Sequence, residues 1–231
     1  MQTSGLTLTR QEPLNNIVRA AYQALASVLG GAQSLHVSSY DEAYAVPTEE
    51  AALLSLRTQQ IIQSETAVTE VVDPLGGSYY VEALTDEIEK RIVDELSEIE
   101  AQGGYVKAIE RGWLHRKVAT YFQAEQAKIE SGEIPIVGLN CYKSDRKAAA
   151  IDVFSYPEGA EERQLEKIEK LKDERNTSQA QKALKDLKKA CTSDTNIIPY
   201  SLECARAGCT EGEVFKVFKS AYGLWSPPEV F

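Results

Sequence analysis

Residues that commonly hold metal ions are scarce in this sequence. Among 231 residues there are 2 histidines and 4 cysteines, and no two cysteines have the C-x-x-C spacing. Structural zinc sites usually need four such ligands, often in closely spaced pairs. We therefore expect no metal ligand in this chain.

The sequence also has no excess of positive charge and no long apolar run. The sequence has 25 Lys and Arg against 35 Asp and Glu, a net charge of −10. Because duplex binding rests on clustered Lys and Arg, nucleic acid is not an expected partner. No run approaches the roughly 18–20 apolar residues of a membrane span, and residues 1–10 lack the pattern of a secretory signal. We expect no membrane partner, a cytoplasmic location and reduced thiols.

Residues 1–72 predict a strand–helix–strand–helix order. Thr and Leu alternate over residues 1–9 like the end of a strand, and residues 34–39 form a second short strand-like run. Apolar side chains recur at helical spacing over residues 17–29, and Thr48 followed by two acids indicates the start of another helix. This order is typical of parallel α/β structure.

Residues 73–155 are predicted to form a helical segment with one short strand. An apolar stripe over residues 84–99 predicts a long helix. Gly112 divides two further helical stretches, and the lone apolar run 134–139 predicts the strand.

Residues 156–231 are predicted to form a C-terminal helical extension. In its first helix the apolar side chains are expected to face inward, and Ser178 is expected to cap the next helix. Thr210 and Glu213 have the spacing of a capping box, which predicts the start of the last helix. The inward-facing residues of the first helix are Leu165, Ile168 and Leu171.

Few residues point to chemistry on their own. His36 lies between apolar neighbours, which favours a buried structural histidine over a functional one, and His115 lies beside basic residues, which favours a solvated position. Asp41 and Glu42 follow a predicted strand, where α/β enzymes place functional groups, although acids also begin helices. These residues alone identify neither a reaction nor a catalytic residue.

Several motifs nevertheless follow one another in a familiar order and spacing. They are Gln2-Thr3-Ser4-Gly5, Asn15-Asn16-Ile17-Val18-Arg19, Gly30-Gly31-Ala32-Gln33-Ser34-Leu35-His36, Asp41-Glu42-Ala43, Arg57-Thr58-Gln59-Gln60, Asp73-Pro74-Leu75-Gly76-Gly77-Ser78-Tyr79-Tyr80 and Val137-Gly138-Leu139-Asn140. In this order they resemble the coenzyme-B12-dependent acyl-CoA mutases, in particular the large subunits whose cobalamin-binding domain is a separate chain. The resemblance covers nearly all of the sequence.

The resemblance implies an α/β fold in which residues 1–72 are the last βα units of a (βα)8 TIM barrel, followed by a mainly helical extension. It also implies a radical carbon-skeleton isomerisation, of which (R)-methylmalonyl-CoA to succinyl-CoA is the first choice. The implied cofactor is adenosylcobalamin, bound jointly with another domain or chain. The acyl-CoA substrate threads the barrel, and the corrinoid covers the C-terminal ends of its strands.

The resemblance further implies which residues line the site. A carboxylate accepts hydrogen bonds from a ribose diol, and a glycine lets a flat macrocycle approach the backbone. Neutral side chains hold a thioester without a charge that must be desolvated. The implied cofactor-binding residues are Gln2, Gly5, Glu42 (on the adenosyl ribose) and Ala45; the implied substrate-binding residues are Gln33, Ser34 and His36, the last in the barrel interior.

Two departures from the family pattern leave the acyl group open. Val37-Ser38 stands where the family usually has Thr-Asn, and Leu6 where many members have Trp. Mutases for isobutyryl-, 2-hydroxyisobutyryl- or ethylmalonyl-CoA therefore remain alternatives. The family's cobalt-ligand motif, D-x-H-x-x-G, is absent, so we expect a cobalamin-binding subunit as partner.

The barrel pattern covers only part of a barrel. A complete (βα)8 barrel takes about 250 residues, and residues 1–72 correspond to about two of its eight units. We therefore expect a C-terminal part of a mutase large subunit, inactive alone, that needs the remaining barrel portion as a partner. The alternative is a non-catalytic helical docking module that uses the region from Leu84 onward. The presence of Gln2, Gly5, Gln33 and Glu42 favours the mutase.

Overall fold

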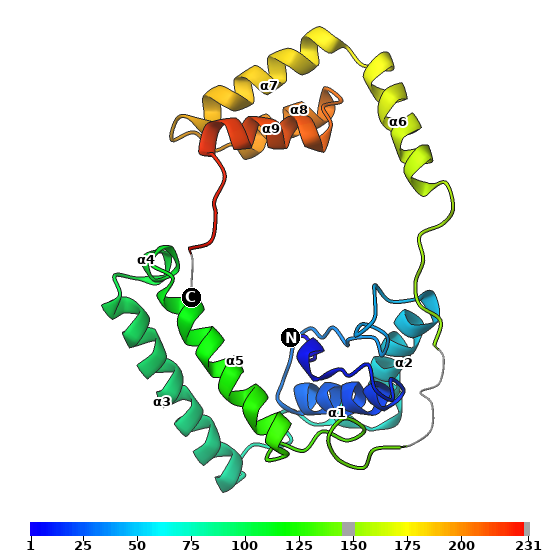
Figure 1. The fold of residues 1–231 in the computed structure, drawn as a ribbon, viewed down its shortest axis with the longest axis vertical. Helices are drawn as coiled ribbons and strands as arrows, with labels where there is room; N and C mark the ends of the chain where they lie inside the picture. The colour runs from blue at the N-terminus through cyan, green and yellow to red at the C-terminus, as the bar shows by residue number, and fades with distance from the viewer. Residues whose placement is uncertain (145–150, 229–231) are drawn as a thin grey trace. The chain divides into compact units, whose positions relative to one another are not determined.

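The computed structural model describes residues 1–144 and 151–228, and these residues are mainly helical (Figure 1). They divide into two compact units, the first within Met1–Ser155 together with Pro228 and the second within Tyr156–Pro227. The division into residues 1–72, 73–155 and 156–231 stays a prediction.

The two strands predicted in the first part of the chain are reduced to one parallel bridge between Gln2 and His36. Thr3 N donates to His36 O at 3.0 Å, and His36 N donates to Met1 O at 2.9 Å. A strand needs neighbours along its edges, and the described residues supply no third strand to extend this ladder. The predicted α/β class is therefore corrected to a mainly helical one for the described residues, and the barrel portion stays a prediction.

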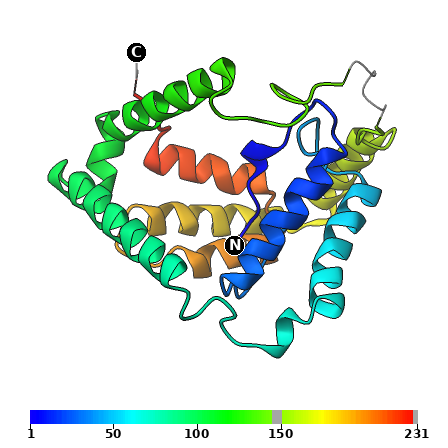
Figure 2. The ribbon, with the colours of Figure 1, turned by 90° about the horizontal axis from the view of Figure 1, so that it is seen from below.

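Two helices pack together beneath the bridge. They are α1 (Asn15–Leu29) and α2 (Glu49–Glu65), which lie side by side in Figure 2. Their shared core contains Ala20 and Ala24 of α1, Ile62 of α2, and Val37 from the bridge segment. Thr48 caps α2 as predicted, because its hydroxyl oxygen accepts from Ala51 N at 3.3 Å.

Three further helices complete the first unit: α3 (Tyr79–Ala101), α4 (Tyr105–Glu110) and α5 (Trp113–Ser131), besides the short 3-10 helices η1 (Gly5–Thr7) and η2 (Val68–Glu70). Gly112 separates α4 from α5 as predicted, at a φ of +67° that favours glycine. Lys117 of α5 pairs with Glu95 and Glu98 of α3. The predicted apolar stripe of α3 is largely exposed among the described residues.

The strand predicted at residues 134–139 is not present. The segment is a turn closed by a bridge between Val137 and Cys141, with Gly138 at a φ of +78°. Asn140 organises the turn: its Oδ1 accepts from Ile136 N at 2.6 Å and its Nδ2 donates to Ile134 O at 2.7 Å. Its amide also donates at 2.8 Å to Ile129 O, which accepts from Gly132 N at 3.2 Å as well, so the turn is tied to the end of α5.

The second unit is built from α6 (Ala160–Glu174), α7 (Thr177–Cys191), α8 (Ile198–Arg206) and α9 (Glu211–Tyr222). Helices α8 and α9 both pack on α7, around a core of Leu187, Cys191 and Cys204. Burial raises the pKa of the Cys204 thiol to about 11, so this thiol is protonated and unreactive at neutral pH.

Three details of the second unit differ from the predictions. Asn176, rather than Ser178, caps α7, with Oδ1 accepting from Gln179 N at 3.0 Å. Leu165 and Leu171 of α6 are exposed instead of inward-facing, because α6 packs along no other described helix. Helix α8 was not foreseen from the sequence.

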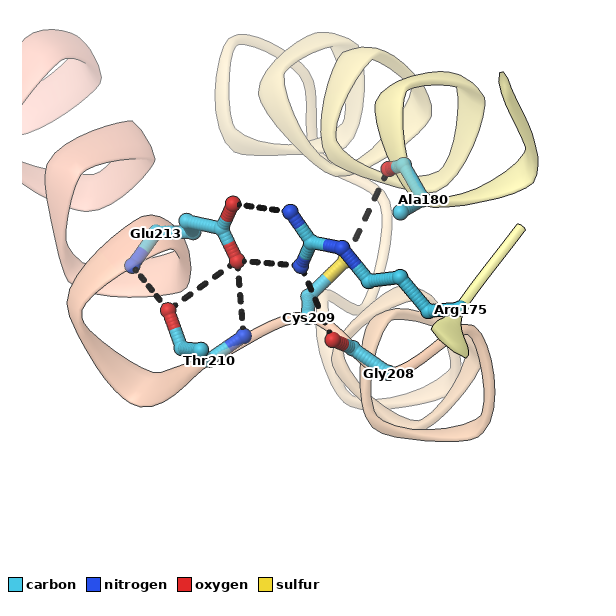
Figure 3. Close-up of polar contacts among 6 residues, drawn as sticks. All are labelled: Arg175, Ala180, Gly208, Cys209, Thr210 and Glu213. Atoms are coloured by element: carbon cyan, nitrogen blue, oxygen red, sulfur yellow. Dashed lines mark hydrogen bonds and ion pairs between the residues drawn. The ribbon is translucent and has the colours of Figure 1, made fainter. Parts of the chain in front are cut away.

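Arg175 ties the end of α6 to the start of α9 (Figure 3). Its two terminal nitrogens each donate to one carboxylate oxygen of Glu213 at 2.6 Å, and Nη1 also donates to Gly208 O at 2.9 Å. The predicted capping box is confirmed, since Thr210 and Glu213 bond reciprocally. The Arg175 hydrogen bonds lower the pKa of Glu213 to about 2.

Glu213→Gln is expected to lower the free energy of unfolding of the second unit by about 1.5–3 kcal/mol at pH 7, the usual scale for a hydrogen bond to a charged group. The folded-state pKa lies below the ordinary 4.5, so this stabilisation is complete above that pH and is lost as the pH falls through about 2. Urea unfolding of the full chain at several pH values measures the difference, which should narrow in acid.

The matched control for this prediction is Glu203→Gln. Glu203 also pairs with an arginine, Arg206, but both side chains are more than half exposed. Exposed pairs contribute about 0–1 kcal/mol. An equal loss in the two variants would contradict the stabilising role of the Arg175 pair.

Candidate functional site

The residues proposed from the sequence lie on two segments of the first unit that meet at the parallel bridge. Gln2 and His36 are paired across the bridge, so their side chains share one face. Ser34 lies in a bend two residues before His36. All three residues are exposed, and so is Gln33. The structure thus brings Gln2 and His36 to one open polar face, and Ser34 is exposed in the bend that precedes it.

The expectation of a buried His36 is wrong. His36 is exposed, whereas its neighbour Val37 is 1% exposed and packs on the helices. Successive side chains of an extended segment point to opposite faces, so burial of Val37 places His36 on the other side. The apolar neighbours therefore mark the face opposite to the histidine.

Gly5 lies in η1, on the same N-terminal segment as Gln2. A Cβ atom added at Gly5 meets no atom within 4 Å. Crowding by the described residues therefore does not require glycine here. The surface in front of its backbone is open to a group that approaches from outside.

Glu42 and Ala45 lie together in the turn between the bridge segment and α2. Glu42 Oε1 accepts from Ser39 N at 2.7 Å, and Glu42 N donates to Ser39 O at 3.2 Å. No described residue donates to the other carboxylate oxygen, Oε2. The carboxylate is therefore held by one oxygen and has a second that can accept hydrogen bonds.

Asn16 supports this turn from below, a role that the sequence analysis missed. It is fully buried, and its Nδ2 donates to Tyr40 O at 3.0 Å and to Thr9 O at 2.9 Å. Its Oδ1 accepts from Thr9 N at 3.1 Å and from Arg19 Nη1 at 2.8 Å. One amide thus fixes the residue before Asp41 to α1 and to the N-terminal segment.

A groove of about 850 Å³ lies in the same unit, between α1, α5 and the turn at 134–137. Leu6 and Thr7 line one end of it, next to Gly5. Arg19 and Val137 both line the groove, and Arg19 Nη2 donates to Val137 O at 2.6 Å. This bond joins two walls of the groove that are 118 residues apart in the sequence. No local sequence signal predicts such a groove, because its walls come from distant segments.

The described residues contain neither a metal-binding cluster nor a membrane-spanning helix. Within residues 1–144 and 151–228, no three His, Cys, Asp or Glu side chains gather closely enough to bind a metal ion. None of the described helices combines the length and apolar character that a membrane crossing requires.

The family model for methylmalonyl-CoA mutase matches residues 1–224. The chain belongs to the methylmalonyl-CoA mutase family.

Curated relatives have similar identity over almost the whole chain. The 2-hydroxyisobutanoyl-CoA mutase large subunit of Aquincola tertiaricarbonis is 40% identical over 231 residues, which are 100% of this chain and 41% of that protein. The methylmalonyl-CoA mutase of Rhizobium meliloti (strain 1021) is 40% identical over 234 residues, covering 99% and 32%. The human mitochondrial methylmalonyl-CoA mutase is 40% identical over 224 residues, covering 96% and 30%. The chain thus spans between 30% and 41% of the length of these relatives.

Asn16→Ala is expected to lower the free energy of unfolding of the first unit by about 2–4 kcal/mol, because it leaves several buried backbone groups without partners. Urea unfolding of the full chain measures the loss. Asn15→Ala is the matched control, since Asn15 is only half-buried and its amide bonds a single side chain, Glu12, at 2.8 Å. Equal losses in the two variants would contradict the supporting role of Asn16.

Proposed function

We propose that this chain is the C-terminal segment of the large subunit of a cobalamin-dependent acyl-CoA mutase. The observation that carries the proposal is the pairing of Gln2 and His36 on one exposed polar face, with the exposed Ser34 bend before it and the Glu42 turn after it. Membership of the family supports the same reading. The remaining barrel portion and a cobalamin-binding subunit are the proposed partners.

The residues present fit the proposed cofactor. Gly5 leaves open surface against which a macrocycle can lie, and Gln2 offers a neutral polar contact beside it. Glu42 has a carboxylate oxygen available to accept hydrogen bonds from a ribose diol, with Ala45 in the same turn. When bound, adenosylcobalamin supplies the radical chemistry.

The chain's own residues then serve binding and exclusion. Gln33, Ser34 and His36 present hydrogen-bonding groups toward the CoA ester, and the two amide or hydroxyl side chains do so without a formal charge. On the opposite side of this segment, Val37 packs into the apolar core of α1 and α2, which excludes water from that side.

The proposed reaction is the isomerisation of (R)-methylmalonyl-CoA to succinyl-CoA. The rival substrates are 2-hydroxyisobutyryl-, isobutyryl- and ethylmalonyl-CoA. Relatives named for methylmalonyl-CoA and for 2-hydroxyisobutanoyl-CoA are both 40% identical to this chain. Overall identity therefore does not separate these substrates, and the exposed residue at position 6 is where we expect the acyl group to be distinguished.

Turnover is expected only when this chain is combined with the missing barrel portion and a cobalamin-binding chain, because about two barrel units do not enclose a CoA ester. The assay is conversion of methylmalonyl-CoA to succinyl-CoA with adenosylcobalamin, for each component and for the mixture. Turnover by this chain alone would refute the segment reading. No turnover of any acyl-CoA by the mixture would favour the docking module, and turnover of another acyl-CoA only would change the substrate.

Glu42→Gln in the reconstituted enzyme is expected to weaken adenosylcobalamin binding by on the order of 1–3 kcal/mol, the scale of losing a charged hydrogen-bond partner. Binding of hydroxocobalamin, which has no adenosyl group, should change little. Glu49→Gln is the control, an exposed acid in the first turn of α2 with the same change of charge. Equal weakening of binding for both cobalamins would contradict the assignment of Glu42 as the residue that binds the ribose.

A further inference from the structure

The turn that carries Glu42 is fixed to α2 by the side chain of Asp41. Asp41 Oδ2 accepts from Thr48 N at 2.8 Å and from Thr48 Oγ1 at 3.0 Å. Thr48 Oγ1 in turn accepts from Ala51 N at the start of α2. The carboxylate therefore joins the beginning of the turn to the first turn of a helix.

The backbone of Asp41 holds the interior of the same turn. Its carbonyl oxygen accepts from Tyr44 N at 2.8 Å and from Ala45 N at 3.3 Å. With the Ser39–Glu42 pair, these bonds bracket Glu42 on both sides. Because Asp41 and Glu42 are adjacent in the chain, a shift in the backbone of Asp41 also shifts Glu42.

Stability does not account for an aspartate at this position. Asp41 is 2% exposed, and its Oδ1 is buried with no hydrogen-bond partner among the described residues. A buried carboxylate with an unpaired oxygen is destabilising relative to a neutral group of the same shape. An asparagine has the same shape and an oxygen that can still accept from Thr48, but its bonds are weaker because they lack the charge.

We propose that Asp41 is a positioning residue for the cofactor site: its charged tie to Thr48 holds Glu42 in the orientation that receives the ribose. The inference rests on the proposed function, in which Glu42 is the ribose acid. Asp41 touches no ligand itself, since its side chain is buried beneath the turn.

The test uses the reconstituted enzyme and the dissociation constants of adenosylcobalamin and hydroxocobalamin, measured by equilibrium dialysis. Asp41→Asn is expected to raise the Kd of adenosylcobalamin about tenfold and that of hydroxocobalamin less than about twofold, as a charged tie becomes a neutral one. The melting temperature should change little, because asparagine keeps the shape and an oxygen that accepts from Thr48. A residue with a merely structural role would weaken both cobalamins and lower the melting temperature together.

A double-mutant cycle locates the effect. If Asp41 acts through Glu42, then Asp41→Asn adds nothing to the loss already caused by Glu42→Gln. Thr48→Ser keeps both hydrogen bonds to Asp41 and should bind like the wild type. Thr48→Val keeps only the backbone bond and should show a smaller loss than Asp41→Asn, which tests the tie without changing the carboxylate.

The outcomes separate this inference from the proposed function. Additive losses in the cycle, or an unchanged adenosylcobalamin Kd in Asp41→Asn while Glu42→Gln is impaired, would overturn the positioning role alone. If Glu42→Gln binds both cobalamins like the wild type, the ribose assignment fails and the positioning role fails with it.

Discussion

The side chain of Asn16 bonds three separate segments, and the candidate site depends on that amide. It joins α1 to the N-terminal segment at Thr9 and to the residue that precedes the acidic turn. A buried amide has two donors and one oxygen, and here every one is used. The polar face is held by the backbone bonds of one bridge, whereas the Glu42 turn is irregular backbone whose placement comes from such side-chain bonds.

In the second unit a polar side chain at the end of α6 plays a similar part. Arg175 follows the last residue of α6, and its guanidinium reaches the capping glutamate of α9. Its side chain is 12% exposed and that of Glu213 is 28% exposed, so the pair is shielded more than an ordinary surface ion pair. In both units a single polar side chain at a helix end fixes the relation between segments distant in sequence.

The elements that the sequence predicts correctly are those whose hydrogen bonds join residues close in the chain. The caps at Thr48 and Thr210 and the break at Gly112 involve bonds within a few residues, and all three were predicted correctly. The strand at residues 134–139 was wrong because Asn140, which follows the apolar run, folds it back into a turn. Helix α8 was missed because nine residues give too short an apolar pattern.

The residues of the candidate site stay a prediction from the family resemblance, and the residues that support them were not predicted. Family resemblance pointed to Glu42 and Gln2, whereas Asn16 and Asp41 act through partners 24 and 7 residues away, which no local pattern reveals. The apolar neighbours of His36 predict burial for it, but Val37 is buried and His36 is exposed. The alternation of an extended segment reverses that conclusion.

The hydrogen bond between Arg19 and Val137 closes a loop whose ends are 118 residues apart. The free energy of closing a flexible loop rises by only about 0.6 kcal/mol for each doubling of its length. Insertions in the arm that contains α3 and α4 should therefore be thermodynamically mild. Cutting that arm is a different matter, because it converts an internal closure into an association of two chains, which costs on the order of 4–15 kcal/mol in lost translation and rotation. In this chain, a backbone cut between α2 and α5 should accordingly destabilise the first unit much more than a change in the length of that arm.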